Sequence, residues 1–162
     1  MIMEKGVLKK AGEHDLDWLL EVENDASHWA VGGRTHSYTR HELADFLSRN
    51  QSFLPGGNLR WIICCEEEEE PVGVLDIFAY HREKKMASVG ILIIESMHRR
   101  KGYGLQALGE LEKLAFFEWD LLVLQAIVQP ENSASQGLFA KAGYAFKRKQ
   151  DQGLLLFEKH RP

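Results

Sequence analysis

The residues best suited to chemistry form a short basic segment with two glycines, Arg99-Arg100-Lys101-Gly102-Tyr103-Gly104. It lies between an apolar run, residues 89–94, and a helical pattern of leucines that begins near Leu105. The first N–H groups of a helix have no partner within the helix, and they attract anions. Because glycine has no Cβ, an oxygen-rich ligand can approach the main chain there. The sequence therefore predicts a phosphate-binding turn between a strand and a helix.

Two common phosphate-binding loops do not fit this turn. A Walker loop needs Gly-x-x-x-x-Gly-Lys-Ser/Thr, a string that the chain lacks. The dinucleotide-binding pattern Gly-x-Gly-x-x-Gly meets Ala107 at its last position, and the next strand ends in Gln129-Pro130 without an acidic partner for ribose. What remains is Arg-x-x-Gly-x-Gly after an apolar strand. An ordinary basic turn with loop glycines stays open as an alternative.

Hydrophobic spacing predicts the elements that must position this turn. They are a strand at 6–10, helices at 13–24 and from 39, strands at 59–65, 72–80 and 86–94, a helix at 105–118, a strand at 121–128, a helix at 132–142, and strands at 144–147 and 154–158. The Leu, Val and Ile content of 121–128 predicts a strand covered on both faces. With no repeat and no linker, residues 1–162 are expected to form a single domain.

Composition narrows the class of protein. A chain of 162 residues with 44% hydrophobic content suits one globular domain with a real core. The net charge of −4 argues against a general nucleic-acid binder and weakly favours a cationic substrate. No apolar run approaches the roughly 20 residues of a membrane span, and the first residues do not resemble a signal peptide. The adjacent Cys64 and Cys65 are not expected to form a disulfide, which fits a reducing cytoplasm.

A second motif, from Asn132 to Tyr144, gives the sequence a family resemblance. It is similar to the segment Asn-x-x-Ala/Ser-x-x-Leu-Tyr-x-x-x-Gly-Phe, and with the phosphate-binding turn and the element order it resembles the general-control-related N-acetyltransferase (GNAT) superfamily. Shorter matches at 23–25, 72–73 and 89–91 resemble the branch with spermidine and ribosomal-protein N-acetyltransferases. The resemblance implies an α+β fold of three layers. Its mixed, mostly antiparallel seven-stranded sheet would be flanked by about four helices.

The same resemblance implies a site for acetyl-CoA, used as a co-substrate. We expect no metal, because the seven histidines and two cysteines show no spacing typical of metal ligands. The main chain at 92–94 would bind the pantetheine arm and the thioester, residues 99–105 the diphosphate, and Asn132 the pantetheine or the start of its own helix. The expected residues are Leu92, Ile93, Ile94, Arg99, Arg100, Lys101, Gly102, Tyr103, Gly104, Leu105 and Asn132.

Candidates for catalysis are fewer. Asp76 is a carboxylate within an apolar strand and is the expected base, while Glu95 could relay a proton through water. Family members often use a tyrosine as the acid where this chain has Phe139, which has no proton to give. Tyr144, Tyr103 or a water could serve instead, or the thiolate could leave unaided. His28, His36 and Tyr38 are expected to line the acceptor pocket.

The expected reaction moves an acetyl group from acetyl-CoA to a primary amine by direct attack in a ternary complex. A polyamine or another small amine is favoured as acceptor. The alternatives are acetylation of a protein N-terminus, such as that of a ribosomal protein, and a non-catalytic acyl-CoA sensor of the same fold. An unrelated nucleotide-binding α+β domain also stays open. We expect no nucleic-acid or membrane partner, a cytoplasmic location and a possible homodimer.

Overall fold

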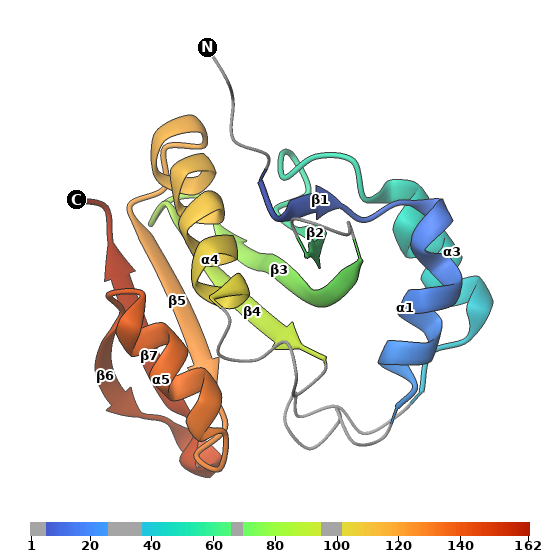
Figure 1. Ribbon diagram of the computed structural model, residues 1–162. Coiled ribbons are helices and arrows are strands. Elements are labelled where there is room, and N and C mark those ends of the chain that lie inside the picture. Colours follow the sequence, from blue (N-terminus) through green and yellow to red (C-terminus); the bar gives the residue numbers. More distant parts are fainter. Residues whose placement is uncertain (1–5, 26–36, 66–69, 95–101) are drawn as a thin grey trace.

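The computed structural model describes residues 6–25, 37–65, 70–94 and 102–162 (Figure 1). Its elements are β1 (Leu8–Lys10), α1 (Leu16–Glu23), α3 (Arg40–Arg49), β2 (Leu59–Cys64), β3 (Pro71–His81), β4 (Met86–Ile93), α4 (Tyr103–Lys113), β5 (Val123–Val128), α5 (Ser133–Lys141), β6 (Ala145–Lys149) and β7 (Leu155–His160). A 3₁₀ turn, Glu13–Asp15, precedes α1, and a π-helical turn, Leu114–Glu118, extends α4. A second 3₁₀ turn, Asp151–Gly153, joins β6 to β7.

The strands form one sheet in the order β1-β2-β3-β4-β5-β7-β6, and only β4 and β5 pair in parallel. That pairing is short and sets Met86–Ser88 opposite Val123–Gln125. Beyond it, β4 stays paired with β3 as far as Ile93, and β5 stays paired with β7 as far as Val128. The two central strands therefore diverge after Ser88 (Figure 1).

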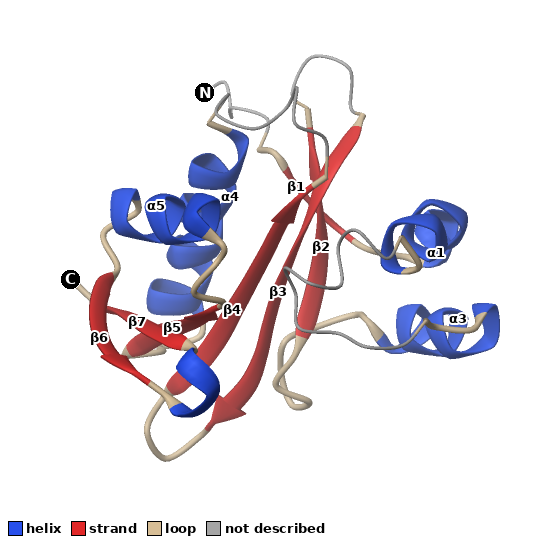
Figure 2. Cartoon of the chain, turned by 90° about the horizontal axis from the view of Figure 1, so that it is seen from below, coloured by secondary structure: helices blue, strands red, loops and turns tan. Residues whose placement is uncertain are grey.

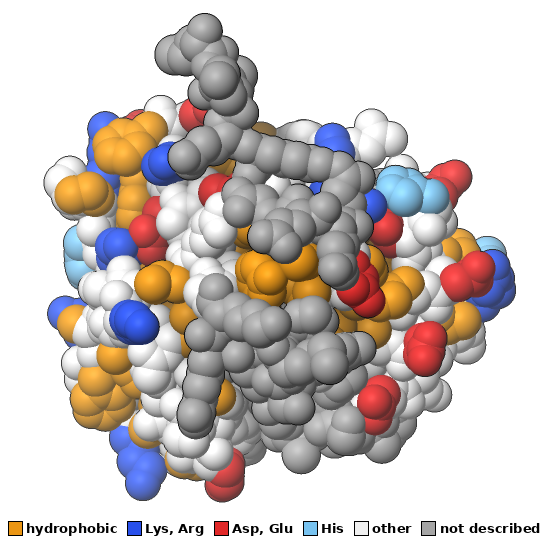
Figure 3. Space-filling view, viewed as in Figure 1, with side chains coloured by type: hydrophobic (Ala, Val, Ile, Leu, Met, Phe, Trp, Pro, Cys, Tyr) orange, Lys and Arg blue, Asp and Glu red, His pale blue; other side chains and the backbone are white. Residues whose placement is uncertain are grey.

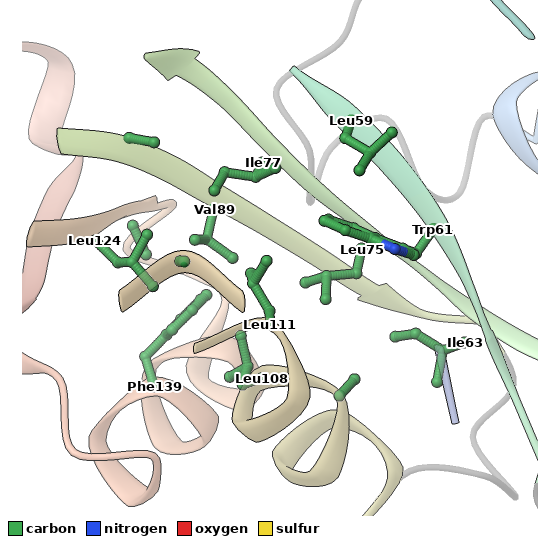
Figure 4. Packing of buried hydrophobic residues seen from close by; sticks show 14 of the residues in the cluster. Leu59, Trp61, Ile63, Leu75, Ile77, Val89, Leu108, Leu111, Leu124 and Phe139 are labelled. Carbon is green, nitrogen blue, oxygen red and sulfur yellow. The ribbon is translucent and has the colours of Figure 1, made fainter. Parts of the chain in front are cut away.

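Helices cover the sheet from two sides. In the view from below, α4 and α5 lie against one face and α1 and α3 lie against the other (Figure 2). The larger core cluster lies under α4 and α5, where Leu108 and Leu111 meet strand residues such as Leu75 and Val89 (Figure 4). The smaller cluster lies under α1 and α3 and takes Ile62 and Val74 from the sheet. Successive residues of a strand point to opposite faces, so β2 contributes to both cores.

The predicted element order and the mixed, mostly antiparallel sheet with four flanking helices are confirmed within the described residues. Thr39 caps α3, since its hydroxyl accepts a 3.1 Å hydrogen bond from the N–H of Glu42. Gly143 ends α5 in the left-handed region, with φ +96°. Both features follow from local rules for helix ends.

The prediction of a strand at 121–128 that is covered on both faces is wrong. The strand begins at Val123, and burial alternates along it: Leu124 is fully buried, whereas the side chain of Ile127 is 47% exposed. The reason is the uneven covering of the sheet. The cluster under α1 and α3 draws its strand residues from β2 and β3, so the same face at β5 is left more open.

Candidate functional site

A cleft of about 690 Å³ opens where β4 and β5 diverge. Three elements line it: the end of β4, the start of α4 and one face of α5. The lining residues are Ile91, Leu92, Ile93, Gly102, Tyr103, Gly104, Leu105, Asn132, Ser133, Ala134, Ser135, Gly137, Leu138 and Lys141. The space-filling view shows hydrophobic side chains gathered near the centre of the face seen in Figure 1 (Figure 3). The cleft suits a long ligand with both apolar and anionic parts.

The start of α4 forms the end of this cleft at which the sequence predicts phosphate binding. Gly102 has φ +85°, and its carbonyl accepts the first helical hydrogen bond, from the N–H of Gln106 at 2.9 Å. The next N–H groups, at residues 103–105, belong to the first turn and have no acceptor within the helix. They lie on residues that line the cleft, where the positive end of the helix favours an anion.

The two glycines of the turn serve different purposes. A Cβ on Gly102 would meet no atom within 4 Å, so glycine is needed there for its positive φ. Gly104 is buried, and a Cβ on it would lie 3.0 Å from Cδ2 of Leu138 on α5. Glycine at 104 therefore brings the two helices close together and narrows the cleft between them.

The end of β4 supplies the opposite wall. Its parallel register with β5 ends at Ser88, so Ile91, Leu92 and Ile93 face the cleft where a neighbouring strand would otherwise lie. A ligand with amide groups can bind such a strand edge through the main chain. Ile94 differs: its N–H donates to the carbonyl of Val72 at 2.9 Å, and its side chain packs against the smaller core. It does not line the cleft.

Asn132 caps α5 and also lines the cleft. Its Oδ1 accepts from the N–H of Ser135 at 3.1 Å, and its Nδ2 donates to the hydroxyl of Ser135 at 2.9 Å. The capping role is thus present in the structure. The predicted contact with pantetheine stays a prediction; among the described residues, the Asn132 amide nitrogen donates only to Ser135.

Asp76 lies in a charged cluster on the other face of the sheet, beneath α1 and α3. The guanidinium of Arg60 donates to both carboxylate oxygens of Asp76, at 2.7 Å and 3.0 Å, and to Oε1 of Glu23 at 2.6 Å. The ring of Phe46 lies 5.3 Å from the guanidinium carbon. Burial alone would lower the pKa of Arg60, but the charges and hydrogen bonds of Asp76 and Glu23 raise it above its ordinary value.

This cluster is joined to the segment expected to bind the acceptor. Glu23 is the last residue of α1, and the side chain of the following Asn24 pairs with the main chain of Tyr38. Nδ2 of Asn24 donates to the carbonyl of Tyr38 at 3.0 Å, and the N–H of Tyr38 donates back to Oδ1 at 2.8 Å. Asn24 and Tyr38 are therefore held together, and Asn24 directly follows a member of the Arg60 cluster, Glu23.

Tyr144 lies in the core. Its ring meets Phe139 edge to face at 5.0 Å, and its buried hydroxyl has no hydrogen-bond partner among the described residues. Burial, and then the nearby charge of Glu112, raise the pKa of Tyr144 far above its ordinary value. Neither aromatic residue lines the cleft. Tyr103 does line it, and its hydroxyl lies 3.1 Å from Sγ of Cys65.

The structure thus brings together a large part of the predicted cofactor site and places two of the predicted catalytic residues, Asp76 and Tyr144, outside the cleft. The predicted residues that line the cleft are Leu92, Ile93, Gly102, Tyr103, Gly104, Leu105 and Asn132. Asp76, Tyr38 and Tyr144 lie elsewhere, as described above. The predicted residues Glu95, Arg99, Arg100, Lys101, His28 and His36 lie outside the described residues.

Sequence reasoning missed two features of the site. Arg60 is a charged residue in an apolar strand, the same signal that singled out Asp76. The cleft-facing stripe of α5, at residues 134, 137, 138 and 141, has the spacing of one helix face. The sequence marks both as unusual, but the residues that they face are set by strand register and helix packing.

Comparison with known proteins agrees with this geometry. Residues 7–145 match the family model described as the acetyltransferase (GNAT) domain, so the chain belongs to the GNAT acetyltransferase family. A search of curated proteins finds no match.

Several solved structures share the fold at low sequence identity. Spermidine N-acetyltransferase from Vibrio cholerae, in complex with CoA and spermine, has a TM-score of 0.82 and 13% identity over 95% of this chain and 94% of that one. RimL, a ribosomal L7/L12 α-N-protein acetyltransferase in complex with coenzyme A, has a TM-score of 0.78 and 19% identity over 94% and 92%. A GNAT acetyltransferase from Bacillus anthracis has a TM-score of 0.74 and 18% identity over 95% and 93%.

The described residues, 6–25, 37–65, 70–94 and 102–162, lack two further features. Their helices include none with the length and apolar character needed to cross a membrane. Nor do these residues contain three His, Cys, Asp or Glu side chains grouped so that they could hold a metal ion.

Proposed function

We propose that the chain is an acetyl-CoA-dependent N-acetyltransferase acting on a primary amine. The observation that carries this proposal is the cleft itself: the start of α4, the diverging end of β4 and the capped start of α5 meet around one space of about 690 Å³. Each wall offers the chemistry that a different part of the coenzyme needs. Two structural relatives were solved with coenzyme A, which supports the same assignment.

The described residues fit the coenzyme in three places. The first N–H groups of α4, at residues 103–105, would hold the diphosphate. The main chain at 91–93 would bind the amides of the pantetheine arm, and one of its N–H groups would polarise the thioester carbonyl. Asn132 would bind pantetheine with the N–H that its cap does not use. Acetyl-CoA supplies the activated acetyl group, and the chain orients it.

A small polycation is the acceptor that we favour. Three acidic side chains lie on α1: Asp17 pairs with Arg40, Glu23 pairs with Arg60, and Glu21 is the third. The space-filling view shows more acidic groups on the side of α1 than on the side of α5 (Figure 3). With a net charge of −4, the chain attracts cationic amines over neutral ones. One structural relative is a spermidine N-acetyltransferase, which is consistent with this choice.

The amine has to lose a proton before it attacks, because its pKa is about 10 in water. Among the carboxylates that the structure describes, we propose Asp76 as the base that removes this proton. Its cross-strand partner on β4 is Gly90, which has no side chain to cover it, and the Asp76 side chain is 29% exposed. Arg60 binds both oxygens and so fixes the orientation of the carboxylate.

The thiolate is proposed to leave without Tyr144 as proton donor. Phe139 has no hydroxyl, and that of Tyr144 is buried away from the cleft. A thiolate is a weak base and tolerates unassisted departure. Tyr144→Phe should therefore leave kcat unchanged, measured by thiol release over a pH range. A loss of about 100-fold, typical of a missing general acid, would identify Tyr144 as the donor after all.

The proposed activity is tested by a thiol-release screen with acetyl-CoA against polyamines, amino acids, aminoglycosides and short peptides. We expect release with polyamines, and Gly102→Asp, which places a carboxylate at the phosphate-binding turn, should abolish it. Release with peptides alone would point to a protein N-terminus as acceptor. Binding of acetyl-CoA without release by any amine would identify a sensor. Thermal stabilisation by ATP or NAD but not by CoA would refute the coenzyme assignment.

A further inference from the structure

One face of α5 forms a wall of the cleft. Ala134, Gly137, Leu138 and Lys141 line the space, and their spacing of three, one and three residues places them on a single helix face. The first two residues of this stripe are small. A Cβ added to Gly137 would meet no atom within 4 Å, so the glycine is not required for packing within the protein. This part of α5 therefore leaves open space next to its main chain.

The stripe can be positioned relative to the phosphate-binding turn. Leu138 is the residue that meets α4 at Gly104, where an added Cβ would be 3.0 Å from the leucine Cδ2. Lys141 follows Leu138 by three residues, so their Cβ atoms lie about 5–6 Å apart on the same face. The side chain of Lys141 therefore leaves α5 one helical turn beyond Leu138, the residue that contacts the start of α4.

Lys141 is also distinctive by its charge. Among the described residues that line the cleft, it alone carries a charged side chain. Lys159, which contacts the residue after Lys141, is already committed, because its ammonium donates to Oε2 of Glu112 and to the carbonyl of Ala142, both at 2.8 Å. Lys141 itself is exposed and forms no ion pair with any described carboxylate. A cation at this place is suited to an anionic group of the ligand.

We propose that Lys141 binds the 3′-phosphate on the adenosine of coenzyme A and makes the cleft selective for the 3′-phosphorylated coenzyme. This role presupposes the proposed function, in which the cleft binds acetyl-CoA. The diphosphate and the 3′-phosphate leave the same ribose ring, so a diphosphate at the start of α4 requires the 3′-phosphate to lie close by. The open space beside Ala134 and Gly137 gives the nucleoside room against α5.

The test measures dissociation constants by calorimetry at low salt, for coenzyme A and for 3′-dephospho-coenzyme A. In Lys141→Gln, we expect coenzyme A to bind about tenfold more weakly, the loss typical of a hydrogen bond to a charged group, and the dephospho form to bind as before. Lys141→Arg should retain most of the preference. Lys147→Gln, which removes an exposed lysine of β6 outside the cleft, is the matched control. The tenfold difference should shrink as salt rises.

Two results would overturn this role. If Lys141→Gln weakens the binding of both ligands equally, the lysine contacts the diphosphate and not the 3′-phosphate. If the affinity for both ligands is unchanged, the lysine binds no phosphate. In either case, binding of coenzyme A by the unmodified protein would leave the proposed function standing. Failure of the unmodified protein to bind coenzyme A would instead refute both.

Discussion

Replacing Arg60 with methionine tests how much the buried charge cluster contributes to stability. Methionine keeps an apolar stem of similar length but removes the cation that binds Asp76 and Glu23. Breaking a fully buried pair in this way costs roughly 3–5 kcal/mol, because it leaves a carboxylate in the interior without a counter-charge. Here the exposed fractions are 16% for Arg60 and Glu23 and 29% for Asp76. Since water still reaches Asp76, we expect a smaller loss, of about 2–3 kcal/mol.

A matched control exists on the surface. Arg49 and Asp45 form an ion pair at 2.6 Å, the same distance as between Arg60 and Glu23, but their side chains are 74% and 56% exposed. Exposed pairs contribute about 0–1 kcal/mol, so Arg49→Met should have little effect. Urea unfolding followed by tryptophan fluorescence and circular dichroism gives both free energies. Equal losses in the two variants would show that burial does not decide the contribution of such a pair.

The same variant separates acceptor binding from coenzyme binding. Arg60 lies on the face of the sheet opposite the larger core, and through Glu23 it is joined to the Asn24–Tyr38 pairing. We expect Arg60→Met to lower kcat/KM for the amine while the dissociation constant of coenzyme A stays the same. A weakened coenzyme affinity with an unchanged KM for the amine would contradict this prediction, which places the amine on the side of α1 and α3 and the coenzyme in the cleft beside α4 and α5.

Two further variants test single features of the fold. Gly104→Val should destabilise the protein by about 1–3 kcal/mol and weaken coenzyme binding, because a Cβ at residue 104 would lie 3.0 Å from Cδ2 of Leu138 on α5. Gly109→Ala, in the open middle of the same helix, should be neutral or stabilising, and equal thermal shifts for both would refute the packing argument. Asp120 is exposed, and hydrogen bonds from Lys85 and Arg161 lower its pKa. Its contribution to stability is therefore present above the ordinary carboxyl pKa and lost as pH falls, so Asp120→Asn should be less stable than the unmodified protein at neutral pH and equal to it in acid.

Local patterns in the sequence were sufficient for the element order and for the glycine turn before α4, and phosphate binding at this turn stays a prediction. The period of apolar residues depends on local geometry alone, and a glycine-bearing turn before a helix creates its anion site from its own N–H groups. The capping of α3 by Thr39 and of α5 by Asn132 and Gly143 follows from the same kind of rule. These features needed no knowledge of distant residues.

What the sequence did not predict correctly has one cause. Burial of Ile127 and the position of the Tyr144 hydroxyl depend on which helices cover which part of the sheet. The pairing of Arg60 with Asp76 depends on the register between β2 and β3, which sets these two residues opposite each other. No periodicity within one segment contains that information.

The sequence by itself determined which segments form strands and helices and that a left-handed glycine precedes α4, because these depend on neighbouring residues. Only the tertiary structure decided that β4 and β5 diverge after Ser88, that Lys141 faces the opening, and that Arg60 joins Asp76 to α1. The physical reason is that the width of a cleft and the partner of a buried charge are set by contacts between segments far apart in the chain.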